Sequence, residues 1–153
     1  MITLEPVGYV RGGRHEPLDD DWGGVEAVIA LDGNRFGDDA VDGLNSFSHL
    51  VVVFQFHLVD ESAVQSGARH PRGNPDWPKV GMFAQRAKMR PNRLGVSACR
   101  LLAVDGLDLR VRGLDAVDGS PVLDVKPYLS EFEPAPAEVR EPAWARELMA
   151  RYW

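Results

Sequence analysis

Glycine and proline divide this chain into short segments, and this division limits its fold more than any other feature of the sequence. Fifteen glycines and eleven prolines occur among the 153 residues, and they separate short runs rich in β-forming residues. This spacing favours a compact barrel or sandwich over a helical bundle. The predicted strands span residues 3–10, 25–31, 49–57, 80–84, 94–104, 107–114 and 121–125.

The strands at residues 94–104 and 107–114 form the clearest predicted hairpin. They meet at Asp105-Gly106, a dipeptide that favours the tight turns of hairpins. No parallel βαβ repeat and no glycine-rich loop between a strand and a helix is visible, so a doubly wound fold is not expected. Any cofactor must therefore be bound by other means.

A single domain is expected over residues 1–153, with a helical extension at about residues 137–153. Pro142 stands at or near the first turn of the predicted terminal helix. Trp144, Leu148 and Tyr152 fall roughly on one face of it, which predicts packing onto the body of the protein or onto a second subunit, with a ligand site as the alternative.

The composition indicates a soluble, cytoplasmic protein without a disulfide or a metal site. The longest apolar run, residues 50–56, is interrupted by Gln55 and is too short to span a bilayer, and no secretory signal precedes it. The single cysteine, Cys99, excludes an intramolecular disulfide and a cysteine zinc site. Its alternating surroundings predict a small buried apolar residue and not a nucleophile. His57 and His70 are too far from any acid pair to suggest a metal.

Charge is distributed unevenly along this acidic chain, whose formal net charge is −6. Residues 65–100 contain eight cations and one acid, Asp76, whereas acids concentrate at residues 19–21, at residues 38–39 and in the last third. A local basic face is compatible with docking a structured RNA at one place. A solvated surface without a phosphate partner is the alternative.

Two loops carry opposite charges in unusual settings. Arg86, Lys88, Arg90 and Arg93 surround Pro91-Asn92, where proline fixes φ and favours a stiff bend suited to an anion or a polar ligand. Later in the chain, Asp115 and Asp118 precede the turn Gly119-Ser120-Pro121.

Four motifs follow one another along the chain: VGYVR at residues 7–11, FSHL at 47–50, GMFAQRAKMRPNRLG at 81–95 and DAVDGSPVLDVKPY at 115–128. In this order they resemble the TsaA-like (TrmO-type) family of S-adenosylmethionine-dependent methyltransferases. The two long motifs fix many residue types at fixed spacing, so they are far more specific than a glycine fingerprint. The resemblance extends from about Leu4 to Tyr128.

The resemblance implies a mainly β protein, a compact antiparallel β-barrel with a few short helices and a C-terminal helix. It also implies S-adenosyl-L-methionine as cofactor and a homodimer with the cofactor at or near the subunit interface. The implied reaction is N6-methylation of threonylcarbamoyl-adenosine beside the anticodon of tRNA. Methylation of a small-molecule acceptor by the same barrel, or cofactor binding without turnover, are the alternatives.

Arg86 is the first candidate for a cofactor contact, because a guanidinium recognises a carboxylate bidentately and Arg86 occupies the family's arginine position. Asp115 is a candidate partner for a hydroxyl or ammonium group, and the alternative is an acid that only stabilises its turn. By resemblance, the cofactor also contacts Trp22, Gly23, Gly24, His57, Leu58, Val96, Arg112, Gly113 and Leu114.

Methyl transfer from a sulfonium needs positioning more than acid or base chemistry. The resemblance places Arg90, Asn92, Asp118, Lys126 and Tyr128 at or beside the active site. Lys126 or Tyr128 is expected to orient the acceptor or take up its proton, with Asp124 or Asp118 holding the lysine.

Structural roles are open for two of these candidates. Asp124 and Lys126 face the same side of a strand, so a purely structural buried pair is equally compatible with the sequence. His49 is expected to be a core histidine bonded to a main-chain group, with a catalytic role as the alternative.

Two positions depart from the family pattern. Arg93 follows Asn92 where the family has proline, and Ala87-Lys88-Met89 replaces a spacer that commonly contains Ser-Pro. These extra cations are expected to alter the face presented to the acceptor. The chain is also expected to lack the C-terminal domain of longer bacterial members, together with its RNA contacts.

Overall fold

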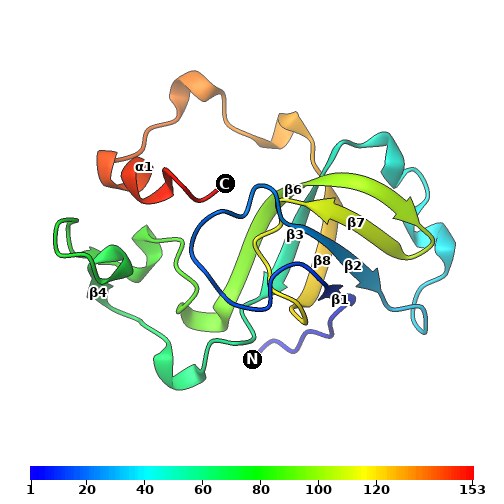
Figure 1. Ribbon diagram of the computed structural model, residues 1–153, viewed down its shortest axis with the longest axis horizontal. Coiled ribbons are helices and arrows are strands. Elements are labelled where there is room, and N and C mark those ends of the chain that lie inside the picture. Colours follow the sequence, from blue (N-terminus) through cyan, green and yellow to red (C-terminus); the bar gives the residue numbers. More distant parts are fainter.

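The computed structural model describes residues 1–153. Its centre is a closed barrel of antiparallel strands in the order β1-β2-β7-β6-β3-β8. Figure 1 shows the barrel on the right, with α1 and the segment around β4 on the left. The expected mainly β antiparallel barrel is confirmed.

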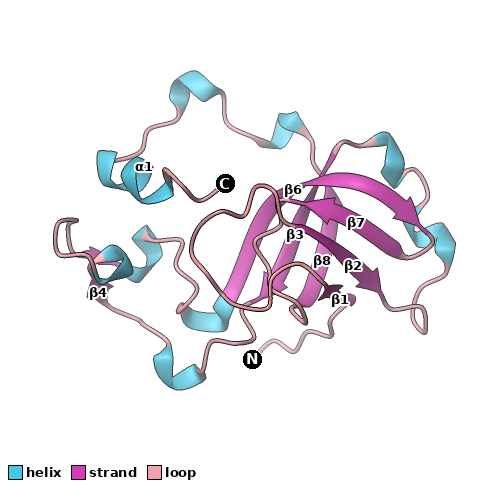
Figure 2. Cartoon of the chain, viewed as in Figure 1, coloured by secondary structure: helices cyan, strands magenta, loops and turns pink.

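The barrel strands are β1 (Gly8–Arg11), β2 (Glu26–Leu31), β3 (His49–Gln55), β6 (Leu94–Asp105), β7 (Asp108–Arg112) and β8 (Pro121–Pro127). A separate two-stranded sheet consists of β4 (Ala68–Arg69) and β5 (Val80–Gly81), and the α-helix is α1 (Ala143–Met149). Short 3-10 helices, drawn in cyan with α1 in Figure 2, span Asp38–Val41, Leu44–Ser46, Glu61–Ala63, Pro71–Gly73, Met82–Ala84, Pro91–Arg93, Ser130–Phe132 and Pro136–Glu138. None of the helices is both long enough and apolar enough to cross a membrane.

The core lies inside the barrel and follows the period of two that strands impose on side chains. On β3, Leu50, Val52 and Phe54 point inward and are buried, while the residues between them are half-buried. Gly95 lies opposite Phe54 on β6, and a Cβ atom there would come within 2.5 Å of the Phe54 ring. The absence of a side chain at Gly95 therefore makes room for the Phe54 ring in the core.

Cys99 belongs to this core and is 3% exposed. Burial, reinforced by the charge of Asp115, raises the pKa of its thiol to about 12. The thiolate is the reactive form of cysteine, so the thiol is inert at neutral pH. The prediction of a small buried apolar residue is confirmed.

The predicted hairpin between β6 and β7 is also confirmed, because Asp105 pairs with Asp108 across a tight turn. Gly106 has a φ of +56° in this turn, a value that glycine adopts without steric cost. The predicted terminal helix is present as α1, with Pro142 at its N-cap.

Two predicted strands differ from the structure by three residues or more, and the other boundaries agree within two residues. The first strand begins at Gly8 and not at residue 3. The strand predicted over residues 80–84 ends at Gly81, and Met82–Ala84 forms a 3-10 helix instead. The reason is that Met82 and Gln85, three residues apart, both point inward and are buried, which a strand cannot achieve.

Candidate functional site

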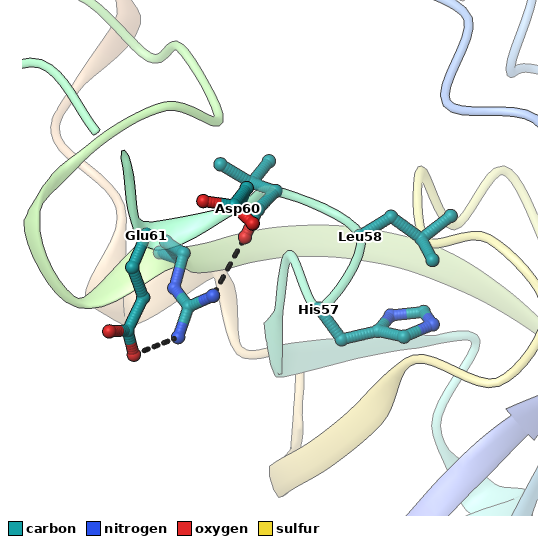
Figure 3. Close-up of a pocket in the computed structure, with 6 residues that line it drawn as sticks. His57, Leu58, Asp60 and Glu61 are labelled. Carbon is teal, nitrogen blue, oxygen red and sulfur yellow. Dashed lines mark hydrogen bonds and ion pairs between the residues drawn. The ribbon is translucent and has the colours of Figure 1, made fainter. Parts of the chain in front are cut away.

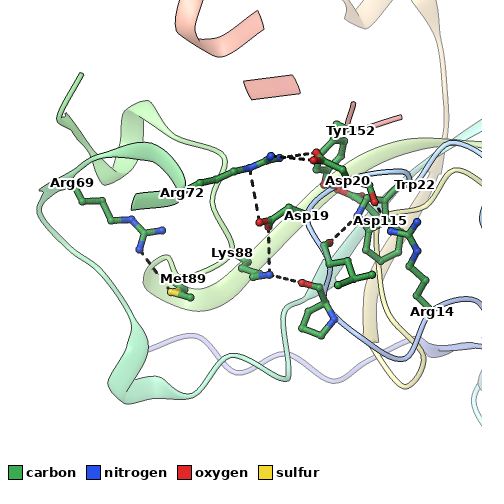
Figure 4. Close-up of polar contacts among 12 residues, drawn as sticks. Arg14, Asp19, Asp20, Trp22, Arg69, Arg72, Lys88, Met89, Asp115 and Tyr152 are labelled. Atoms are coloured by element: carbon green, nitrogen blue, oxygen red, sulfur yellow. Dashed lines mark hydrogen bonds and ion pairs between the residues drawn. The ribbon is translucent and has the colours of Figure 1, made fainter. Parts of the chain in front are cut away.

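Asp115 is the centre of a hydrogen-bonded cluster that begins just after β7. The hydroxyl of Ser97, on β6, donates to one carboxylate oxygen, and the hydroxyl of Tyr152, beyond α1, donates to the other. Asp115 and Tyr152 are half-buried, and Ser97 is buried. Three segments far apart in the sequence thus meet at one carboxylate, as Figure 4 shows for Asp115 and Tyr152.

Arg86 lies beside this cluster on the loop before β6. Its Nη2 atom donates to the carbonyl oxygen of Val96 at 2.7 Å, while its other guanidinium nitrogens donate no bond within the protein. Burial and the Asp115 charge raise the pKa of Tyr152, and the positive charge of Arg86 partly opposes them, which places Arg86 near Tyr152. The free nitrogens of an exposed guanidinium can bind a carboxylate.

The loop at residues 22–24 forms another side of the same region. Trp22 is 3% exposed, its indole N–H donates to the Leu18 carbonyl at 3.1 Å, and the Arg14 guanidinium stacks 4.6 Å from its ring centroid. Gly113 is close to this loop, because a Cβ atom on Gly113 would lie 3.6 Å from the Gly23 carbonyl oxygen. The structure therefore brings together Trp22, Gly23, Arg86, Val96, Gly113 and Asp115.

The remaining predicted cofactor residues in this region have different surroundings. Gly24 and Arg112 are exposed, and Arg112 faces outward from β7 opposite Glu26 on β2. Leu114 is 1% exposed and belongs to the core, so its side chain is not available to a ligand.

The sequence did not indicate that residues 151–153 contribute to this site. The main-chain N–H groups of Asp21 and Trp22 donate to the carbonyls of Arg151 (2.9 Å) and Tyr152 (2.8 Å). A Cβ atom on Gly23 would come within 2.7 Å of the carbonyl carbon of Trp153. The close approach that was expected between Gly23 and a ligand is made by the protein's own chain.

His57 and Leu58 follow β3 and line a different, open cavity of about 540 Å³. The cavity is lined by His57, Leu58, Val59, Asp60, Glu61 and Arg93. Figure 3 shows the His57 ring directed away from Glu61. His57 Nε2 lies 3.5 Å from the place where a Cβ atom of Gly119 would stand, so His57 adjoins the turn after Asp118.

The residues predicted to be catalytic do not converge within one chain. Asp118 accepts a bond from the main-chain N–H of Gly12 at 2.7 Å and lies 3.4 Å from His15 Nδ1. Tyr128 lies beside His49, at the start of β3, whereas the Asp118 turn adjoins His57 beyond the end of that strand. The seven-residue β3 separates these two places by roughly 20 Å.

The structure contradicts one alternative and one expectation for this region. Lys126 and Asp124 form an ion pair at 2.9 Å, but their side chains are 66% and 48% exposed, so the pair is not buried. His49 is half-buried, and its Nδ1 lies 2.6 Å from the Ser48 hydroxyl, so it is not a core histidine bonded to the main chain.

The bend at Pro91-Asn92 is stiff, as expected, but most of its cations are used inside the protein. Asn92 and Arg93 have φ values of 65° and 52°, which are uncommon for residues with side chains. Arg90 donates to the carbonyls of Gln85 and Ala87 at 2.7 and 3.3 Å. Arg93 donates to the Val59 carbonyl at 2.7 Å and pairs with Glu61 at 3.3 Å.

The basic segment, residues 65–100, also contacts the acidic residues 19–21, although the two lie far apart in the sequence. Arg72 pairs with Asp20 at 2.9 Å, and Lys88 lies 3.7 Å from Asp19 while donating to the Pro17 carbonyl at 2.7 Å. Figure 4 shows both cations reaching toward these carboxylates. The basic face is therefore smaller than the sequence predicted. The basic-segment and β7 cations without an ion pair are Arg69, Lys79, Arg86, Arg90, Arg100, Arg110 and Arg112.

Comparison with known proteins gives a family. Residues 20–134 match the family described as the tRNA-methyltransferase O N-terminal domain. A probable S-adenosyl-L-methionine-binding protein of Methanothermobacter thermautotrophicus is 45% identical over 136 residues, which cover 86% of this chain and 93% of that protein. The tRNA (adenine(37)-N6)-methyltransferase of Escherichia coli is 43% identical over 104 residues, which cover 64% of this chain.

The fold is shared with solved structures as well. The crystal structure of TrmO from Pseudomonas aeruginosa superposes with a TM-score of 0.70 and 30% identity, covering 92% of this chain. The chain spans 61% of that solved protein and 43% of the Escherichia coli enzyme. The extent of the family match and the likeness to the archaeal relative show that this chain belongs to the family of the tRNA-methyltransferase O N-terminal domain.

Proposed function

We propose that this protein is an S-adenosylmethionine-dependent methyltransferase that acts on adenosine 37 of tRNA, and that its acceptor is N6 of threonylcarbamoyl-adenosine. The observation that carries the proposal is the cluster around Asp115, in which Arg86, Trp22 and Ser97 lie together on one side of the barrel. The names of the Escherichia coli and Methanothermobacter relatives support the reaction and the cofactor.

The residues of this cluster fit the chemical groups of S-adenosylmethionine. The free nitrogens of Arg86 suit its α-carboxylate, and the Asp115 carboxylate suits its ammonium group or a ribose hydroxyl. S-adenosylmethionine supplies an activated methyl group, so the protein has to hold the donor and the acceptor in line. Asp115 and Arg86 would do so by binding and not by exchanging protons.

Unpaired cations beside this cluster support a nucleic-acid acceptor. Arg100 on β6 and Arg112 on β7 are directly opposite each other, and both are exposed. Like charges directly opposite each other destabilise a sheet. Glu26 is opposite Arg112 on its other side but forms no ion pair with it, so both arginines are free to bind a phosphate. Arg112 leads directly into the segment that ends at Asp115, so a phosphate bound here would place RNA beside the proposed cofactor site.

We further propose that the protein is a homodimer formed through the outer face of β3 and β6. The middle of this face is apolar and partly exposed, with Val51, Val53, Leu94, Val96 and Ala98, while His49, Gln55 and Arg100 lie at its ends. Lys126 lies opposite Val51 on the neighbouring strand β8. A second copy on this face would bring its own cofactor cluster close to Lys126, which one chain alone does not do.

Substitution of Ala98 by glutamate tests this interface. Ala98 points outward from the middle of β6, so the fold tolerates the longer side chain, whereas an interface would have to bury an unpaired carboxylate. We expect light scattering to show a dimer for the wild type and a monomer for Ala98→Glu. A wild-type monomer, or a dimer that survives Ala98→Glu, would refute this interface.

The reaction is tested by measuring S-adenosylhomocysteine with tRNA that carries the threonylcarbamoyl group, with tRNA that lacks it, and without an acceptor. We expect product only with the modified tRNA. We also expect Arg86→Ala to weaken S-adenosylmethionine binding about tenfold by calorimetry, because a hydrogen bond to a charged group is lost.

Arg35→Ala is the matched control, since Arg35 lies after the far end of β2 and pairs with Glu5 at 3.8 Å. Product with both tRNAs would broaden the acceptor, and product only with an added small molecule would replace tRNA as the substrate. If the protein binds the cofactor but forms no product under any condition, it is a binding module without turnover.

A further inference from the structure

Residues 151–153 are part of the cluster around Asp115, although α1 separates them in sequence from the barrel strands. Figure 1 shows the chain returning from α1 toward the barrel at its C-terminal end. The helix itself fully buries no residue, and its side chains form two polar contacts, with Trp77 Nε1 at Glu147 (2.9 Å) and with Glu141 at Arg146 (3.1 Å). The segment is held by its own contacts with Asp21, Trp22, Gly23 and Asp115.

Tyr152 makes the contact that matters for the chemistry of the site. Its hydroxyl donates to one Asp115 oxygen, while Ser97 donates to the other. Burial, together with the adjacent Asp115 charge, raises the pKa of Tyr152 far above its ordinary value, so the hydroxyl remains a donor. A carboxylate can accept about four hydrogen bonds, so Asp115 keeps positions for a ligand while both hydroxyls fix its orientation.

We propose that Tyr152 is a positioning residue of the cofactor site, and that the segment 151–153 completes this site by fixing the Asp115 carboxylate. The inference rests on the proposed function, in which Asp115 binds the ammonium group or a ribose hydroxyl of S-adenosylmethionine. It assigns a role in the site to residues outside the matched family region, which ends at residue 134.

The close fit of the segment indicates that it stays in place when a ligand binds. Only a glycine at position 23 leaves room for Trp153, because a Cβ atom would come within 2.7 Å of its carbonyl carbon. If the segment left, the N–H groups of Asp21 and Trp22 would lose their partners. If the segment instead blocked the site until the cofactor displaced it, a substitution that weakened its contacts would make S-adenosylmethionine bind more tightly.

The test is calorimetric binding of S-adenosylmethionine to the wild type and to Tyr152→Phe. Phenylalanine keeps the main-chain bonds and the edge contact with Trp153, whose ring centroid is 4.8 Å away, and removes only the hydroxyl. We expect affinity to fall about tenfold, with a melting curve that shows a folded protein at the temperature of the titration. Tyr9→Phe is the matched control, because Tyr9 is 49% exposed on β1 and its hydroxyl makes no bond.

A double-mutant cycle with Asp115→Asn separates positioning from general stabilisation. If Tyr152 acts through Asp115, the double variant binds no more weakly than Asp115→Asn alone. Additive losses would assign Tyr152 an independent role and overturn the inference. Unchanged or tighter binding by Tyr152→Phe would do the same. A wild type that does not bind S-adenosylmethionine would instead overturn the proposed function, on which this inference depends.

Discussion

Replacing Phe54 with alanine is expected to lower the free energy of unfolding by about 3–5 kcal/mol. The Phe54 side chain is 1% exposed at the centre of the barrel, and its ring lies edge-on to Phe56 with 5.3 Å between the centroids. Gly95 lies directly against the same ring, so β6 has no side chain at this position to fill the space that alanine would leave. Urea unfolding followed by tryptophan fluorescence measures the loss.

Phe132→Ala serves as the control, because Phe132 is 83% exposed in the connector after β8. We expect this variant to differ from the wild type by no more than about 0.5 kcal/mol. A loss below about 1 kcal/mol for Phe54→Ala would mean that the barrel interior rearranges around the cavity, contrary to the close packing described here.

Asp115→Asn is expected to weaken S-adenosylmethionine binding ten- to a hundredfold, the range for losing hydrogen bonds to a charged group. Asparagine can still accept from one hydroxyl, but its amide group cannot accept from the second. The substitution therefore removes the charge and also disturbs either Ser97 or Tyr152. Calorimetric titration, together with a melting curve to verify the fold, measures the effect.

Asp118→Asn is the matched comparison, because it makes the same chemical change three residues later. The Asp118 oxygen accepts from the Gly12 N–H at 2.7 Å, and the asparagine oxygen can do the same. We expect cofactor affinity to remain near that of the wild type. Equal losses of affinity in the two variants would contradict separate roles for these acids. A wild-type single-turnover rate in Asp118→Asn would leave Asp118 a structural residue.

Local patterns in the sequence were sufficient to predict most of the barrel. The alternation in β6 and the Asp105-Gly106 turn depend on neighbouring residues, so the hairpin and the burial of Cys99 could be derived from them. The segment at Met82–Ala84 was misassigned because five residues cannot distinguish strand alternation from a single 3-10 turn.

Long-range pairing explains what the sequence did not reveal about the candidate site. Arg72 and Asp20 are 52 residues apart, and Tyr152 and Asp115 are 37 residues apart. Nothing in the spacing of these residues indicates that they meet, since their contacts depend on how the loops fold over the barrel. The motif resemblance pointed to Arg86 and Asp115 as candidates, but it ended before Tyr152.

Because the barrel is closed, none of its strands has a free edge, but neighbouring strands pair over different lengths. β1 and β8 pair through two residues each, whereas β3 and β6 pair through seven. Local opening of a protein begins where the fewest contacts must break, so the barrel opens most easily at β1. Gly119 donates to the Val10 carbonyl and Asp118 is bonded to Gly12, so the turn after Asp118 is held by β1 and the residue that follows it. Opening of β1 therefore releases the Asp118 turn, while Asp115 remains bonded to Ser97 on β6, the strand with the longest pairing.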